Sequence, residues 1–292
     1  MTASAHQQGN PVSAEDIAHF ETHGYVVLRN VVPAALCAAV IDSIWAFTGY
    51  SPDRPEDWDK PPRGMDARWP QQDIGMLPLF HHQALWDVRQ HPAVHAAFAA
   101  ILGQPELWVS IDRVSFKPPF VTDAAYFAKR GVHWDIDTSA VTFPLPRPRP
   151  VQGLVMLAET AENQGGFHCI PSIFESFEAW LAAQPPDRDP WQLDPKGYDV
   201  VTVTGGPGDL VIWDSLLLHG NGVNRTPDPR FAQYVTMMPA DPAQSRAAEI
   251  ESWRTGTAPS WAPGDPRGWE RQQAPATLTP LGRRLLGTEP WA

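Results

Sequence analysis

The chain has 292 residues, enough for one large domain or two small ones with a substantial buried core. Hydrophobic residues make up 43% of it, which indicates a globular protein and excludes a disordered one. The net charge of -11 argues against a general nucleic-acid-binding protein, because phosphate contacts need Lys and Arg. No apolar signal core opens the chain and no window approaches a membrane span, so we expect a cytoplasmic protein without nucleic-acid or membrane partners.

Helical patterns dominate the first part of the chain. The stretch "SAEDIAHFETHG" predicts a helix with Ser13 as N-cap and Gly24 after its end. A strand over 25–32 follows, and helical spacing returns at 33–47 and 91–103. Between these helices, a polar and proline-rich excursion covers about 50–78, and its length makes it a candidate lid.

From residue 107 onward the pattern changes to short strands separated by Gly or Pro. The strand candidates are "LWVSIDRVSFK", "GVHWDI", "VQGLVMLAE", "GGFHCI", "DVVTV", "GDLVIWDSLLLHG" and "RFAQYVTMM". A helix at 172–184 interrupts them, and Thr279 is the N-cap of a short helix near the end. Helices first and many strands later predict an α+β chain, mainly β, whose strands form a sandwich or a barrel.

The stretch "GVHWDID" carries a histidine and two carboxylates at alternate positions. Side chains alternate faces along a strand, so we expect His133, Asp135 and Asp137 to point the same way. His219 ends another apolar run, "LVIWDSLLLHG", just before the turn signal "NGVN". Two imidazoles and one carboxylate form the facial triad that suits non-haem Fe(II). From the residues alone, ordinary core histidines remain the alternative. Ligation by Asp137 as well would crowd the open coordination positions of the metal, so we expect Asp137 to support the site without binding the metal.

Several motifs, in order over about 13–240, resemble the phytanoyl-CoA dioxygenase family of Fe(II)/2-oxoglutarate oxygenases. They are "FETHGYVVLRNVVP", "SFKPP" ahead of "HWD", "NQGGFHCIPS", "GPGDLVIWDSLLLHG" and "HGNGVNRTPDPR", with an arginine eleven residues after the distal histidine. "CIPSIFES" departs from the family by lacking its Gly-Ser-His element, and about 241–292 falls outside the motifs.

The resemblance implies a double-stranded β-helix, a jelly-roll or cupin-like barrel flanked by N-terminal and inserted helices. We expect a single oxygenase domain over 1–292. Its expected parts are a flexible terminus at 1–12, a helical flank and lid loop at 13–106, a β-helix core at 107–240, and a C-terminal extension packing on the barrel at 241–292.

The resemblance also implies roles for individual residues. His133, Asp135 and His219 would be catalytic and would hold Fe(II). A second set of residues would bind 2-oxoglutarate, and it consists of Arg230, Lys117 and Asn221. A planar guanidinium such as that of Arg230 can hold a carboxylate through two hydrogen bonds.

Candidates for substrate contacts come from two places. Arg68, Trp69 and Gln72 lie in the predicted lid. Arg113 shares a strand face with the expected co-substrate lysine, and Trp134 flanks the metal strand. Each of these roles has a simpler alternative. Arg113 and Lys117 could be solvent-exposed residues at a strand edge, and Trp134 could be a core residue.

The expected function is hydroxylation, or another oxidation, of an unactivated C–H bond of a small molecule, with O2 and 2-oxoglutarate consumed and succinate and CO2 released. Secondary metabolism in a bacterium is the expected setting, and a monomer or homodimer the expected state. Asp135 is present where related halogenases have Gly or Ala, which favours oxygenation. Desaturation, ring formation and epimerisation stay open. Alternatives of another class are an inert barrel-fold binding protein and a zinc hydrolase using the same three ligands.

Overall fold

The computed structural model describes residues 12–119 and 131–291, so part of the terminus expected to be flexible, 1–11, lies outside the described residues. The α-helices are α1 (Ala14–His23), α2 (Ala34–Thr48), α3 (Gln83–Arg89), α4 (Pro92–Leu102), α6 (Pro171–Glu175), α7 (Phe177–Ala182), α8 (Ala247–Thr255) and α9 (Pro280–Leu286). The 3-10 helices are η1 (Pro55–Asp57), η2 (Gln72–Ile74) and η3 (Glu270–Gln272). The strands are β1 (Tyr25–Leu28), β2 (Met76–Leu77), β3 (Leu107–Val109), β4 (Val114–Lys117), β5 (Val132–His133), β6 (Val151–Met156), β7 (Phe167–Cys169), β8 (Gln192–Leu193), β9 (Val201–Thr202), β10 (Leu210–Asp214), β11 (His219–Asn221), β12 (Arg230–Tyr234) and β13 (Met237–Pro239).

Local sequence signals set the ends of α1, as predicted. The Ser13 hydroxyl accepts a hydrogen bond from the Asp16 amide, and the Asp16 carboxylate accepts one from the Ser13 amide at 2.8 Å. Gly24 then takes a left-handed φ of 79°, which glycine adopts at no steric cost. This turn feeds the chain directly into β1.

Two antiparallel sheets form most of the β part of the fold. The six-stranded sheet has the order β1-β10-β6-β12-β4-β2, and the five-stranded sheet has the order β8-β5-β11-β7-β9. Phe167 and Cys169 of β7 share a buried cluster with Leu154 of β6, Trp213 of β10 and Ala232 of β12. Because this cluster joins side chains of both sheets, a common core fills the space between them.

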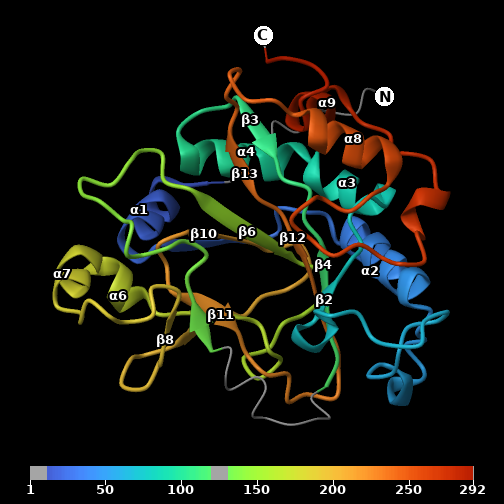
Figure 1. Ribbon diagram of the computed structural model, residues 1–292, viewed down its shortest axis with the longest axis horizontal. Helices are drawn as coiled ribbons and strands as arrows, with labels where there is room; N and C mark the ends of the chain where they lie inside the picture. The colour runs from blue at the N-terminus through green and yellow to red at the C-terminus, as the bar shows by residue number, and fades with distance from the viewer. Residues whose placement is uncertain (1–11, 120–130, 292) are drawn as a thin grey trace, which may run out of the picture.

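Helices cover the other side of the six-stranded sheet. Ile44 of α2, Leu85 of α3 and Phe98 of α4 are fully buried in one cluster with Phe116 of β4 and Ile212 of β10. Figure 1 shows these three helices running beside the sheet, with α6 and α7 placed at the far end of the molecule. Of the helices described, none is long and apolar enough to cross a membrane.

The structure corrects several predicted elements. The stretch from 107 to 117 forms two strands, and β3 pairs with β13 in a separate two-stranded sheet. The predicted helix at 172–184 is divided into α6 and α7 at Ser176, whose hydroxyl donates to the Ser172 carbonyl four residues back. Helices α3, of seven residues, and α8, of nine, were not predicted.

The metal-strand prediction is also corrected. β5 ends at His133, so His133, Asp135 and Asp137 do not alternate along one continuous strand. The Asp137 carboxylate accepts hydrogen bonds from the amide and the hydroxyl of Ser139, at 2.9 and 2.6 Å. This short-range turn bends the chain away from the extended conformation.

The C-terminal segment 241–291 packs beside β3. The Arg246 guanidinium donates to the Val109 carbonyl at 2.6 Å, and the Trp291 indole donates to the Leu107 carbonyl at 3.0 Å. Thr279 caps α9 through a hydrogen bond from the Gly282 amide, as the sequence predicts. In Figure 1, α8 and α9 lie close to α3 and α4.

Candidate metal centre

Two histidines from neighbouring strands form the base of the site. His133 of β5 lies directly opposite His219 of β11 in the antiparallel pair, with their ring centroids 4.9 Å apart. Asp135 follows two residues after His133, just beyond the end of the strand. Residues that are far apart in the sequence are therefore brought together by strand pairing.

The three side chains converge on one point. The Nε2 atom of His133 lies 3.4 Å from Oδ1 of Asp135, and Nε2 of His219 lies 3.4 Å from Oδ2. One potential ligand atom from each residue lies within 4.8 Å of the other two. Ligands held about 2.1 Å from a metal are spaced about 3 Å apart at right angles, so a single ion fits between them with modest adjustment.

The protonation of the site also suits a metal. The Nδ1 atom of His219 lies 2.9 Å from the Leu217 carbonyl oxygen, which can only accept, so Nδ1 donates and Nε2 is left facing Asp135. Burial acts to raise the pKa of Asp135, but hydrogen bonds from His133 and His219 outweigh it and hold that pKa well below its usual range. The potential donor set is thus two imidazole nitrogens and one carboxylate.

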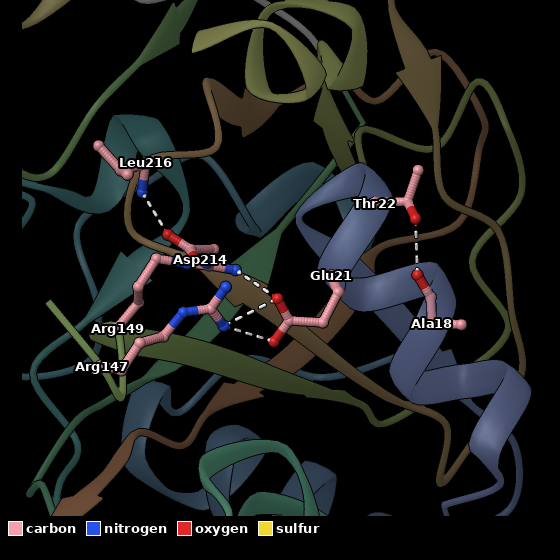
Figure 2. A network of polar contacts seen from close by, with 7 residues as sticks. All are labelled: Ala18, Glu21, Thr22, Arg147, Arg149, Asp214 and Leu216. Carbon is pink, nitrogen blue, oxygen red and sulfur yellow. Dashed lines mark hydrogen bonds and ion pairs between the residues drawn. The ribbon is translucent and has the colours of Figure 1, made fainter. Parts of the chain in front are cut away.

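A polar network fixes the loop that leads to the second histidine (Figure 2). Asp214, at the end of β10, accepts a hydrogen bond from the Leu216 amide at 2.9 Å and another from the Arg149 guanidinium. Arg149 and Arg147 both reach the Glu21 carboxylate of α1, at 3.3 and 2.8 Å. The loop is thereby tied to the first helix of the chain.

The same loop is bonded to the segment that carries the other two ligands. The Trp134 indole, between His133 and Asp135, donates to the Leu216 carbonyl at 2.8 Å. Its ring is 1% exposed and packs against Phe177 and Trp180. Trp134 lines the cavity, and its buried ring joins the segment that carries His133 and Asp135 to the loop before His219.

Gln152 is a site residue that the sequence analysis missed. Its side-chain amide donates to Oδ2 of Asp135 at 2.7 Å from β6, the strand beside β10. Strand periodicity could place Gln152 on a face of its sheet, but only the packing of two sheets brings that face to the metal ligands.

Two buried basic side chains form a pair, and one of them, Lys117, lines the same cavity as the triad. Arg230 of β12 and Lys117 of β4 are register partners, and they are 0% and 4% exposed. Arg230 donates through Nη1 to the Ser115 hydroxyl at 3.3 Å, while its Nε and Nη2 have no hydrogen-bond partner among the described residues. Burial and the neighbouring guanidinium lower the pKa of Lys117 to about 7. Unpaired buried N–H groups are costly, so this pair is suited to hold an anion.

Asn221 follows His219 on β11 and lines the cavity. Its amide nitrogen donates to the Tyr234 hydroxyl at 3.1 Å, and its Oδ1 has no partner among the described residues. The buried, unpaired oxygen shows that this side chain still has capacity to accept a hydrogen bond from a bound molecule.

A cavity of about 580 Å³ opens in front of the triad. Its lining includes the three candidate ligands, Lys117, Asn221 and Arg113. This volume is typical of small-molecule sites.

The lid candidates Arg68, Trp69 and Gln72 are absent from the described lining of that cavity. Trp69 is 3% exposed and stacks on Phe47, with ring centroids 4.9 Å apart. Gln72 is buried and donates to the Tyr50 hydroxyl at 2.7 Å, while Arg68 is exposed. The excursion therefore packs its aromatic and amide side chains into the helical core. A contact of Arg68, Trp69 or Gln72 with a substrate stays a prediction.

The three converging side chains fit a metal site of the facial-triad type. The model of the phytanoyl-CoA dioxygenase (PhyH) family matches residues 20–232. The chain belongs to this family, and it is therefore a dioxygenase that depends on iron, 2-oxoglutarate and O2.

Similar proteins cover most of the chain. It is 24% identical over 257 residues to "Ava biosynthesis cluster protein O" of Aspergillus versicolor, covering 80% of each chain. It is 26% identical over 242 residues to an ectoine dioxygenase of Sphingopyxis alaskensis, covering 75% of this chain and 74% of that one. The crystal structure of the epimerase SnoN in complex with Fe3+, alpha ketoglutarate and nogalamycin RO aligns with a TM-score of 0.53 and 19% identity, over 77% and 83% of the two chains.

Proposed function

We propose that this dioxygenase hydroxylates an unactivated C–H bond of a small molecule in bacterial secondary metabolism, releasing succinate and CO2. The proposal rests on one observation above all: the His-Asp-His triad and Lys117 line one cavity, and Lys117 lies opposite the buried Arg230 in the strand register. The two sheets support the more specific assignment of a double-stranded β-helix core within 107–240. A relative named for a biosynthesis cluster supports the metabolic setting.

In this proposal His133, Asp135 and His219 hold Fe(II), which supplies the oxidising chemistry when O2 and 2-oxoglutarate are present. Gln152 holds one carboxylate oxygen of Asp135, so that the other can face the metal. The rings of Phe167 and Trp213, centred 5.7 and 5.1 Å from that of His219, keep water from its inner side.

The cation pair would bind the distal carboxylate of 2-oxoglutarate. Arg230 offers Nε and Nη2, two donors in one plane, and a carboxylate accepts both at once. Lys117 donates to the Gly222 carbonyl at 2.8 Å and lies close enough to add its charge. A zinc hydrolase or an inert binding protein with the same triad would leave this buried pair without a use.

The test is succinate formation by the purified enzyme with Fe(II), O2 and 2-oxoglutarate, with His219→Ala as the comparison. We expect iron-dependent succinate from the wild type and none from the variant, with an unchanged circular dichroism spectrum. Equal succinate formation by the variant would contradict the assignment of the triad.

A further inference from the structure

Two exposed tryptophans stand at the cavity that holds the triad. Trp191 is 45% exposed and Trp261 is 56% exposed, and they are the two most exposed large hydrophobic side chains in the part of the chain that the structure describes. Both line the cavity. Large aromatic side chains are usually well buried, so two left open at one cavity mark a surface that a ligand can cover.

Trp191 belongs to the wall formed by the five-stranded sheet. It directly precedes β8, whose Gln192 is the register partner of His133. Its carbonyl accepts a hydrogen bond from the Trp134 amide at 2.8 Å. Trp191 is therefore held directly against the segment that carries two of the metal ligands.

Trp261 belongs to the opposite wall, beside the six-stranded sheet. The Arg113 guanidinium carbon lies 4.9 Å from the centroid of its ring, a cation–π contact. Arg113 is itself fixed, because it donates to the Gln71 side chain and lies 3.7 Å from the Asp112 carboxylate. One face of the Trp261 ring is thus occupied by a fixed guanidinium, while more than half of the side chain stays open.

The segment that carries Trp261 lies outside the family match and is anchored on the C-terminal side of the tryptophan. Glu270 accepts hydrogen bonds from the backbone amides of Phe80 and His82, at 3.0 and 3.1 Å, and from that of the residue between them. Arg267 donates to the Phe47 carbonyl at 3.1 Å. The aromatic wall is built into the fold before any ligand arrives.

We propose that Trp191 and Trp261 form a subsite for a flat, conjugated ring of the substrate, with Arg113 as the positioning residue of Trp261. This inference rests on the proposed function, because it takes the cavity to be the substrate chamber. An indole face gains most from stacking on another π surface, whereas a puckered ring touches it only at a few atoms. The nearby Asp112 carboxylate offsets the charge of Arg113. The subsite therefore selects a substrate ring for its planarity rather than for its charge.

The test measures binding by calorimetry to the enzyme loaded anaerobically with Fe(II) and 2-oxoglutarate. The probes are 2-naphthol and its saturated counterpart decahydro-2-naphthol, which share a hydroxyl and a carbon skeleton but differ in planarity. We expect 2-naphthol to bind about tenfold more tightly, and Trp191→Leu and Trp261→Leu each to remove most of that preference. Phe143→Leu changes an exposed aromatic away from this cavity and should leave the preference intact.

Arg113→Met should weaken 2-naphthol binding as much as Trp261→Leu does, with no further loss in the double variant, and Arg113→Lys should restore part of it. Additive losses would show that Arg113 acts apart from Trp261 and would overturn its positioning role. Equal affinity for the two probes, or no binding of either at millimolar concentration, would overturn the subsite. The proposed function fails separately, if the enzyme does not bind 2-oxoglutarate at all.

Discussion

Arg230 and Lys117 lie directly opposite each other on β12 and β4, and both side chains are buried. Two adjacent cations repel each other in a low-dielectric interior, so a bound anion or the loss of one proton favours the pair. Burial, and after it the neighbouring guanidinium, lowers the pKa of Lys117 to about 7. In the proposed function the anion is 2-oxoglutarate, and the first two predictions below test that assignment.

Removing the guanidinium should weaken co-substrate binding. Arg230→Ala deletes the donors Nε and Nη2, so the Kd for 2-oxoglutarate should rise about 100-fold. Anaerobic calorimetry with the metal-loaded enzyme measures this change. Arg225→Ala removes an exposed arginine from the same connection and should leave the Kd unaltered. An equal Kd for wild type and Arg230→Ala would place the anchor elsewhere.

The affinity for 2-oxoglutarate should also depend on pH. Below a pH of about 7 Lys117 is cationic and attracts the dianion, and above it the amine is neutral. Because protonation favours binding, the affinity should fall as the pH rises through about 7, by up to about tenfold per pH unit. In Lys117→Met the profile should be flat and the affinity lower at the acid end. A wild-type affinity that stays constant across this range would rule out a contribution from this lysine.

Gln152 should act on the metal through Asp135. Gln152→Leu removes the donor to Oδ2, and we expect roughly tenfold weaker binding of Co(II), used as an air-stable probe of the site. Gln152→Asn shortens the side chain and should recover part of the loss only if the amide can still reach. Gln184→Leu, whose amide contacts a helix carbonyl far along the chain, is the control. Identical Co(II) affinities for Gln152→Leu and the control would show that the hydrogen bond does not position the ligand.

Glu270 should stabilise the whole fold, because it joins the C-terminal segment to the residues before α3. Glu270→Ala leaves the buried amides of Phe80 and His81 without an acceptor and should lower the free energy of unfolding by about 3 kcal/mol. Urea denaturation measures the change. The Glu251 carboxylate forms an exposed pair with Arg254, so Glu251→Ala should leave the free energy of unfolding almost unchanged. If both variants lost the same free energy of unfolding, the buried Glu270 carboxylate would not anchor the C-terminal segment.

The sequence was most informative where the controlling interactions are local. Ser13 and Gly24 set the ends of α1 through contacts within a few residues, and both were predicted. The period of two across "GVHWDID" was misleading, because the turn at Asp137 and Ser139 ends the extended conformation early. Periodicity describes a strand only as long as no short-range hydrogen bond competes with it.

Residues that act across the fold could not be found in this way. His133 and His219 are 86 positions apart; their residue types and strand positions suggested a shared metal site, and the motif resemblance favoured it over ordinary core histidines. Gln152 and Trp261 carry no signal of their own, since their roles arise from the packing of one sheet on another and of the C-terminal segment on β4. Long-range packing of this kind depends on the whole chain, and a single sequence does not encode it in any short window.

The most direct test of the central claim is anaerobic titration of Fe(II) into the wild type and into Asp135→Ala and His219→Ala. We predict a single Fe(II) bound per wild-type chain and at least about 100-fold weaker binding in both variants, with unchanged circular dichroism spectra. Wild-type affinity in either variant would contradict the account, because it would mean that iron is bound somewhere other than between His133, Asp135 and His219.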